Sequence, residues 1–388
     1  MHFSDRTQWI AGEASSAWDT HYQALAAAEH DPDVLVLSVG DPDFATPTPI
    51  IDAAITALQS GDTHYTPILG LEPLRSALSN HYASIAQTPI SNAQIAVLAG
   101  AQNALFSAAL CTLNPGDEVL TPDPVYVTYD AAIGVSGARL IRVPSASDSF
   151  RPDLAAIERA ITPKTKAIAI ATPNNPTGVT FSADELEAVV ALAKKHQLWL
   201  WSDEVYRELV FETPHTSALQ FNDQWDQLIV IGSMSKSFAM TGWRVGWMIA
   251  PKRLIEHIEN LSLCMLYGLP GFIQQAAEYA ISHGQHHIEA MRQTYQRRRD
   301  VLVRELKALP ELKCIVPEAG MFLMVDVSQT GMTGATFAQK LYADQKVSVL
   351  DGAAFSPRLA HFVRLSFTQP ENKLLDAAQR LTRFIRQS

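Results

Sequence analysis

Seven short apolar segments between residues 95 and 249 alternate with amphipathic helical patterns, and this alternation restricts the fold more than any other feature. Helical patterns such as 183–195 fall between the segments, so we expect a mostly parallel α/β sheet with helices on both faces. The predicted strands cover residues 95–98, 118–120, 139–143, 166–170, 198–201, 228–231 and 246–249.

Polar motifs follow several of these predicted strands directly. Open α/β sheets bind ligands at the carboxyl ends of their strands, where residues far apart in the sequence converge. The motifs after residues 170, 201 and 231 are therefore the first candidates for a functional site.

The most informative of these motifs surrounds Lys236, in the segment Ser233–Gly246. A lysine at the end of a buried strand can form a Schiff base with an aldehyde, and pyridoxal phosphate (PLP) chemistry uses such a lysine beside a phosphate site. Ser233, Ser235 and Arg244 would donate hydrogen bonds to that phosphate. The alternative is an ordinary surface lysine beside a helix.

A second group of polar residues suits the ring of the same cofactor. PLP needs a carboxylate that keeps its pyridine nitrogen protonated, and Asp203 fits this role. Donors to the phenolate oxygen favour its ionised form, and Tyr206 and Asn175 fit that role. Taken alone, Asp203 could be a helix cap and Asn175 part of a turn, but the ordered set Asn175, Asp203 and Lys236 favours a PLP site.

With these motifs the chain resembles the class I and II aminotransferases, which are PLP enzymes of fold type I, from about Val34 to the C-terminus. The resemblance implies that Lys236 binds the cofactor aldehyde and then carries the proton between substrate and cofactor. It implies that Asp203 pairs with the pyridinium, and that Tyr206 and Asn175 contact the ring oxygen. The catalytic residues would be Lys236, Asp203 and Tyr206.

Two further segments resemble cofactor-binding parts of this family. Gly100, Ala101 and Gln102 match its phosphate-binding turn, at the start of a helix whose amides favour an anion. The family often has Gly or Ser in place of Ala101, so the backbone amides must do more here. Tyr126 matches the aromatic residue that covers the cofactor face; the alternative is a core tyrosine.

The substrate carboxylate is assigned to one arginine. Arg364 lies inside the apolar segment 362–367, where an unpaired charge is costly and a bidentate carboxylate partner is favourable. The resemblance implies that Arg364 binds the α-carboxylate of the substrate, with Gly40 and Asn175 beside it. An internal salt bridge is the alternative for Arg364.

Tyr65 resembles the tyrosine with which family members reach the phosphate site of a neighbouring subunit. The resemblance therefore implies a homodimer with shared active sites. No metal ligands are expected, because Cys111, Cys264 and Cys314 are scattered and have no metal-site neighbours.

The amino donor is the least certain part of the sequence interpretation. Segments 18–19, 35–40, 123–129 and 264–268 most resemble family members that move the amino group of arginine to pyruvate. A guanidinium would want a carboxylate at the far end of the site, and Asp19, Glu13 and Asp43 are the candidates. A broad-specificity or aspartate-type aminotransferase is one rival, and a PLP-dependent cysteine-S-conjugate β-lyase is another.

Length predicts more than one domain, since 388 residues exceed the roughly 250–300 at which one core stops growing. We expect an arm at 1–45 that joins a small domain, a large PLP-binding domain at 46–280, and a small α+β domain at 281–388.

Charge and hydropathy exclude several classes of partner. The net charge of −10 argues against nucleic acid, and Arg297–Arg299 is interpreted as a solvated helix face. The chain has no apolar run long enough to span a membrane and no signal-peptide pattern, so we expect a cytoplasmic enzyme.

Overall fold

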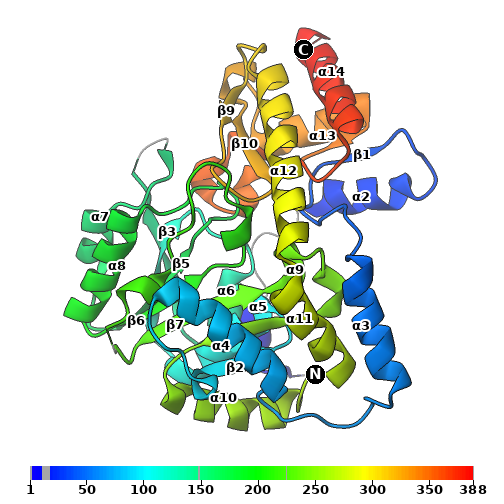
Figure 1. The fold of residues 1–388 in the computed structure, drawn as a ribbon. Coiled ribbons are helices and arrows are strands. Elements are labelled where there is room, and N and C mark those ends of the chain that lie inside the picture. The colour runs from blue at the N-terminus through cyan, green and yellow to red at the C-terminus, as the bar shows by residue number, and fades with distance from the viewer. Residues whose placement is uncertain (1, 11–17, 147–148, 224, 388) are drawn as a thin grey trace.

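A seven-stranded sheet lies at the centre of the larger part of the molecule (Figure 1), in a computed structural model that describes residues 2–10, 18–146, 149–223 and 225–387. Its strand order is β2-β8-β7-β6-β5-β3-β4, and only β8 runs antiparallel to its neighbours. The strands are β2 (Ile95–Leu98), β3 (Glu118–Asp123), β4 (Arg139–Pro144), β5 (Thr165–Ala171), β6 (Trp199–Asp203), β7 (Leu228–Ser233) and β8 (Gly246–Ile249).

Side chains alternate between the two faces of this sheet, as the pleat of a strand requires. Ile168, Leu200 and Val230 belong to the apolar core on one face, whereas Ala169 and Ile229 belong to the core on the other. Because both faces are covered by helices, the strands read as continuous apolar runs.

The helices that contribute to the first core are α3 (Thr48–Gln59), α4 (Glu72–Ala86), α7 (Leu154–Ala160), α8 (Ala183–Lys195) and α11 (Gly271–His283). Those that contribute to the second are α5 (Ala101–Thr112), α6 (Tyr129–Gly134) and α10 (Lys252–Met265). The short helix α9 (Met234–Ser237) follows β7 directly.

A smaller part, at the top of Figure 1, has its own apolar core and an antiparallel sheet of order β12-β13-β10-β9. A two-stranded parallel sheet pairs β1 with β11 and so brings the N-terminal segment into this part. Its elements are β1 (Leu35–Val36), α12 (Gln285–Leu306), β9 (Lys313–Ile315), β10 (Phe322–Asp326), α13 (Gly334–Gln345), β11 (Val347–Ser348), β12 (Leu350–Asp351), β13 (Phe362–Ser366) and α14 (Glu371–Gln387), with α1 (Arg6–Ile10) and α2 (Asp19–Ala28) at the N-terminal end of the chain.

The predicted α/β class and the mostly parallel seven-stranded sheet are confirmed. In the small part, β1 and β9 were not predicted because each has only two or three residues. The domain boundaries near 45 and 280 stay predictions.

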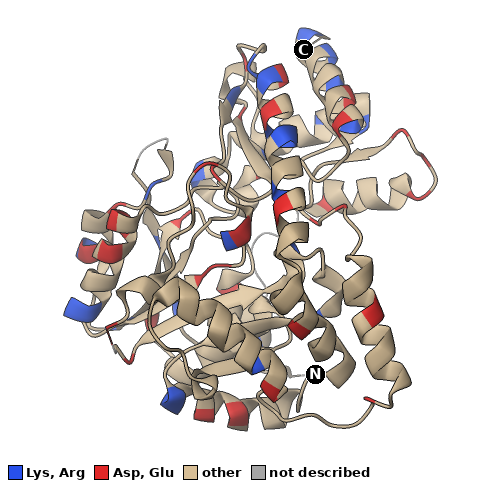
Figure 2. Ribbon diagram, in the orientation of Figure 1, with Lys and Arg blue, Asp and Glu red and all other residues tan. Residues whose placement is uncertain are grey.

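The interpretation of Arg297–Arg299 as a solvated face is wrong for two of the three residues. Arg298 is buried against Asp43, and Arg299 against Glu212. Acidic and basic residues are otherwise mixed along α12 and α14 (Figure 2). Within the described ranges, no helix combines the length and the apolar character needed to cross a bilayer.

Candidate active site

A cavity of about 730 Å³ lies at the carboxyl ends of β5, β6 and β7, where the predicted cofactor residues meet. Its wall also includes residues from the N-terminal segment and from the small part. The predicted site residues that line it are Gly40, Ala101, Gln102, Tyr126, Asn175, Asp203, Tyr206, Ser233, Ser235, Lys236, Arg244 and Arg364.

Lys236 projects from the single turn of α9 toward the N-terminal segment. Its Nζ donates a 2.8 Å hydrogen bond to the carbonyl oxygen of Gly40. Burial lowers the pKa of Lys236 to about 8, and the charges of Arg364 and Arg244 add to this, whereas Asp41 opposes it. A substantial share of this amine is therefore neutral near pH 8 and able to attack an aldehyde.

Asp203 ends β6 and is held by two donors. The hydroxyl of Tyr129 donates to its Oδ2 at 2.9 Å, and the amide of Val205 to its Oδ1 at 3.2 Å. Burial raises the pKa of Asp203 to about 6, although both hydrogen bonds lower it. A carboxylate in this setting favours a cationic partner inside the cavity.

Tyr206 and Tyr126 lie on the same cavity wall. Burial raises the pKa of Tyr206 well above its ordinary value, so its hydroxyl keeps its proton and remains a donor. The ring of Tyr206 packs edge-on against Phe322, with 6.0 Å between centroids. Tyr126 is half-buried and reaches the cavity, which distinguishes it from a fully enclosed core tyrosine.

Arg364, in the middle of β13, is 2 % exposed. It donates to Oδ1 of Asn175 and to the carbonyl oxygen of Ser38, both at 2.9 Å, while its Nε has no hydrogen-bond partner. Its guanidinium carbon lies 4.1 Å from the ring centroid of Phe322. Burial lowers the pKa of Arg364 to about 10.

No acidic side chain of the described residues pairs with Arg364 within 4 Å, so the alternative of an internal salt bridge has no support there. A buried guanidinium with a free donor at the edge of a cavity is suited to a carboxylate ligand.

The predicted phosphate turn forms a tight cradle. Gly100 has a φ of +83° and precedes α5, and a Cβ at this position would lie 2.6 Å from Nη2 of Arg244. A Cβ at Gly246 would in turn lie 2.6 Å from the backbone of Gly100. Glycine is therefore required at both positions, and the amides at the start of α5 are of the kind that can bind an anion.

Ser233 also has a local role, because its hydroxyl accepts from the amide of Ser235 and caps α9. Tyr65, in contrast, is 85 % exposed and packs on Tyr267, outside the cavity of its own chain.

Neither Asp19 nor Asp43, two of the three acidic residues considered for the guanidinium of the donor, lines the cavity. Asp43 forms a bidentate pair with Arg298, at 2.7 and 2.9 Å. Asp19 is exposed and does not line the cavity, and Glu13 lies outside the described residues. Among the described residues, the acidic side chains that do line the cavity are Asp203 and Asp41, which is next to Gly40.

Sequence analysis missed four residues of the site: Tyr129, Asp41, Trp18 and His21. Tyr129 carries no motif, because its role depends on a contact with Asp203 across 74 residues. Trp18 and His21 come from α2 and its N-cap and line the cavity from the N-terminal side. Asp41 could have been found from the sequence, because it directly follows the predicted site residue Gly40.

Known proteins resemble the chain over nearly its whole length. The model of the family "Aminotransferase class I and II" matches residues 32–381. An arginine–pyruvate transaminase of Pseudomonas aeruginosa is 44 % identical over 98 % of this chain and 97 % of the relative. The structure of the Thermus thermophilus aspartate aminotransferase with maleate has a TM-score of 0.93 at 32 % identity, and covers 99 % of this chain and 100 % of that one.

Proposed function

Because this chain belongs to the class I and II aminotransferases, we propose that it binds PLP and moves the α-amino group of L-arginine to pyruvate by ping-pong chemistry. The observation that carries the proposal is the convergence of a half-buried lysine, a half-buried carboxylate and a buried arginine on one cavity.

The cavity fits PLP at each of its polar ends. Asp203 offers a half-buried carboxylate to a protonated ring nitrogen, and Lys236 offers an amine of lowered pKa to the aldehyde. The amides at the start of α5, Ser235 and Arg244 surround the space for a phosphate. Together these groups suit the ring nitrogen, the aldehyde and the phosphate of the cofactor. A site for an anion alone would require only the last of these groups of residues.

When bound, PLP supplies an electron-accepting ring that stabilises negative charge at the α-carbon of the amino acid. Asp203 holds the ring nitrogen protonated, and Tyr206 and Asn175 donate to the ring oxygen. Tyr126 covers one face of the ring. Arg364 binds the α-carboxylate and thereby fixes which bond of the α-carbon faces Lys236.

Lys236 then acts as the general base and acid. Its neutral Nζ would take the proton from the α-carbon of the substrate, and the resulting ammonium would return a proton to the carbon that accepts it in the transfer. The hydrogen bond to the carbonyl oxygen of Gly40 keeps Nζ at the rim of the cavity.

The name of the 44 % identical relative supports arginine as donor and pyruvate as acceptor. The charges of the cavity support the same choice. Arg364 and Arg244 would be matched by the substrate carboxylate and the phosphate, and Asp203 by the ring nitrogen. Asp41 is then left as a carboxylate that, within the described chain, has no cationic partner within 4 Å. We assign Asp41 to the guanidinium of the donor.

An aspartate-type donor would instead need a second cation for its distal carboxylate. Of the described lining residues, His21 is the remaining basic group. Burial, with the charge of Arg364, lowers the pKa of His21, and its Nδ1 lies 2.8 Å from the Ser38 hydroxyl. A neutral imidazole is a poor partner for a carboxylate, which disfavours the aspartate alternative.

The test compares Asp41→Asn with wild type on arginine and alanine as donors, with pyruvate and 2-oxobutyrate as acceptors. We expect kcat/KM for arginine to fall about 10- to 100-fold, because a charge-assisted hydrogen bond is lost, and kcat/KM for alanine to stay within about threefold. Asp19→Asn is the matched control, because Asp19 is an exposed acidic residue at the start of α2 that does not line the cavity. Equal losses of kcat/KM with both donors would instead show that Asp41 acts through the charge of Lys236.

The same assays separate the rival chemistries. Equal rates with many donors would favour a broad-specificity enzyme, and release of ammonia and pyruvate from a cysteine conjugate would favour a β-lyase.

We also propose a homodimer in which Tyr65 reaches the phosphate site of the second subunit. Its support is the exposed pair of Tyr65 and Tyr267 beside the apolar residues Leu263 and Leu266, since exposed aromatic patches mark contact surfaces. Tyr65→Phe should weaken PLP binding without changing the mass measured by light scattering. A monomeric wild-type mass would contradict the proposal.

A further inference from the structure

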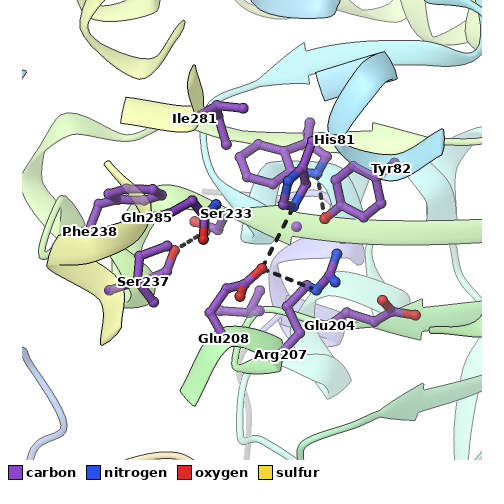
Figure 3. A pocket seen from close by; sticks show the side chains of 14 residues that line it. His81, Tyr82, Glu204, Arg207, Glu208, Ser233, Ser237, Phe238, Ile281 and Gln285 are labelled. Carbon is purple, nitrogen blue, oxygen red and sulfur yellow. Dashed lines mark hydrogen bonds and ion pairs between the residues drawn. The ribbon is translucent and has the colours of Figure 1, made fainter. Parts of the chain in front are cut away.

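A second cavity, of about 20 Å³, lies beside α9, and Figure 3 shows the side chains that line it. That volume has room for one water molecule and for no larger ligand. Ser233 lines both this cavity and the active site. The other polar residues around it are His81, Glu204, Arg207, Glu208, Ser237 and Gln285.

Glu204 is fully buried and directly follows Asp203. Its Oε1 accepts three hydrogen bonds of 3.0 Å, from the hydroxyls of Ser202 and Ser217 and the amide of Ala218. Its Oε2 is buried and has no partner. A carboxylate oxygen left without a donor in such a place costs free energy.

Arg207 has the complementary feature, namely buried donors without an acceptor. Its Nε and Nη1 are buried and make no hydrogen bond, although Nε lies 3.4 Å from Oε1 of Glu208. Its guanidinium lies 5.1 Å from the ring centroid of Tyr82. In Figure 3 the guanidinium stands between the carboxylates of Glu208 and Glu204, and it does not pair with Glu204 within 4 Å.

We propose that this cavity holds one water molecule that accepts a hydrogen bond from Arg207 and donates one to Oε2 of Glu204. The water gives Oε2 of Glu204 a donor and one of the two unpartnered nitrogens of Arg207 an acceptor, and it thereby links the two charges. Arg207 is thereby a positioning residue, since it touches neither substrate nor cofactor.

The network acts on the site through Asp203. The negative charge of Glu204 adds to the burial that raises the pKa of Asp203, and the bridged Arg207 offsets that charge. Tyr82, Glu208, His81 and His215 are the other titratable groups around the network. Burial lowers the pKa of His215 and raises that of Tyr82, so both remain neutral near pH 7. Burial alone would raise the pKa of Glu208, but His81 and Arg207 lower it.

This inference rests on the proposed PLP site, and its test measures the pH dependence of PLP binding by equilibrium dialysis. Arg207→Met keeps the length of the side chain and removes its charge. PLP binding is lost as the pH falls, and we call this part of the profile the acid limb. We expect the midpoint of the acid limb to move up by about half a pH unit or more, because the negative charge of Glu204 beside Asp203 is then not offset. Arg304→Met, at an exposed pair on α12, should leave the profile unchanged.

The double variant Arg207→Met with Glu204→Gln separates charge from shape. If the charge of Glu204 causes the shift, the double variant returns the limb to within about 0.2 units of wild type. A shift that persists in the double variant would overturn the proposal. Should Arg207→Met not fold, Glu204→Gln alone must move the limb down, and an unmoved or raised limb contradicts the proposal.

A crystal structure of the PLP-loaded enzyme gives an independent answer. It should show one ordered water within 3.2 Å of both Arg207 and Glu204. An empty cavity, or a direct pair of the two side chains, would overturn the proposal. If the wild type binds no PLP at all, the proposed function fails, whereas the water is still tested by the crystal structure.

Discussion

The hydroxyl of Tyr129 donates a 2.9 Å hydrogen bond to Oδ2 of Asp203, and it joins a buried tyrosine to a half-buried carboxylate at the carboxyl edge of the large sheet. Tyr129 begins α6 after β3, and Asp203 ends β6. The bond fixes the orientation of the carboxylate that would face the cofactor nitrogen, and it opposes the effect of burial on the pKa of Asp203.

Tyr129→Phe should therefore weaken PLP binding. Loss of the donor raises the pKa of Asp203 further, so less of it is ionised at pH 7. We expect an increase of about 3- to 10-fold in the Kd for PLP, measured by quenching of tryptophan fluorescence. Tyr342→Phe on α13 is the control. A Kd equal to that of wild type from pH 6 to 8 would show that the bond has no such role.

Arg364→Met should separate stability from binding. The guanidinium is buried without an acidic partner among the described residues, so its replacement by an apolar side chain should leave the Tm unchanged or raise it. The value of kcat/KM should fall at least about 100-fold for every donor, because each carries the α-carboxylate. Unchanged kinetics combined with a lowered Tm would assign Arg364 to the core alone.

Lys236 should react as an amine of lowered pKa. Burial penalises the ammonium, so in the apoenzyme the neutral form gains as pH rises through about 8. Competitive labelling with acetic anhydride, read by mass spectrometry, should give a midpoint near that value. The same peptide in urea supplies the reference, with a midpoint of about 10.4. Coincident profiles would contradict the assignment.

Asp43→Asn tests the structural role of a residue that sequence analysis considered for the donor. Asp43 neutralises Arg298, whose side chain is 10 % exposed. The free energy of unfolding in urea should fall by about 1–3 kcal/mol, while the preference for arginine over alanine stays constant. A selective loss of arginine activity at full stability would restore Asp43 as the reader.

Much of the architecture could be predicted from the sequence, because most strands of the large sheet are apolar runs that polar residues follow. Lys236, Asp203 and Asn175 follow three adjacent parallel strands, so their convergence depends on topology that the alternation already indicates. Arg364 was recognisable as a charge inside an apolar strand.

Pairs formed between distant elements could not be predicted in this way. Arg298 and Asp43 are 255 residues apart, and only the packing of α12 against the N-terminal segment brings them together. The three arginines at 297–299 therefore looked solvated although two of them are buried. Asp41 was passed over because its side chain direction, unlike that of a strand residue, follows no periodic pattern.

The most direct test follows the amino group itself. The PLP-loaded protein is incubated with L-arginine labelled with ¹⁵N at the α-position and with unlabelled pyruvate, and the products are separated by mass. The account predicts ¹⁵N-alanine and 2-oxo-5-guanidinopentanoate in equal amounts. Absence of labelled alanine, while aspartate or another donor transfers its label readily, would contradict arginine as the donor; absence of transfer from every α-amino acid would contradict the aminotransferase itself.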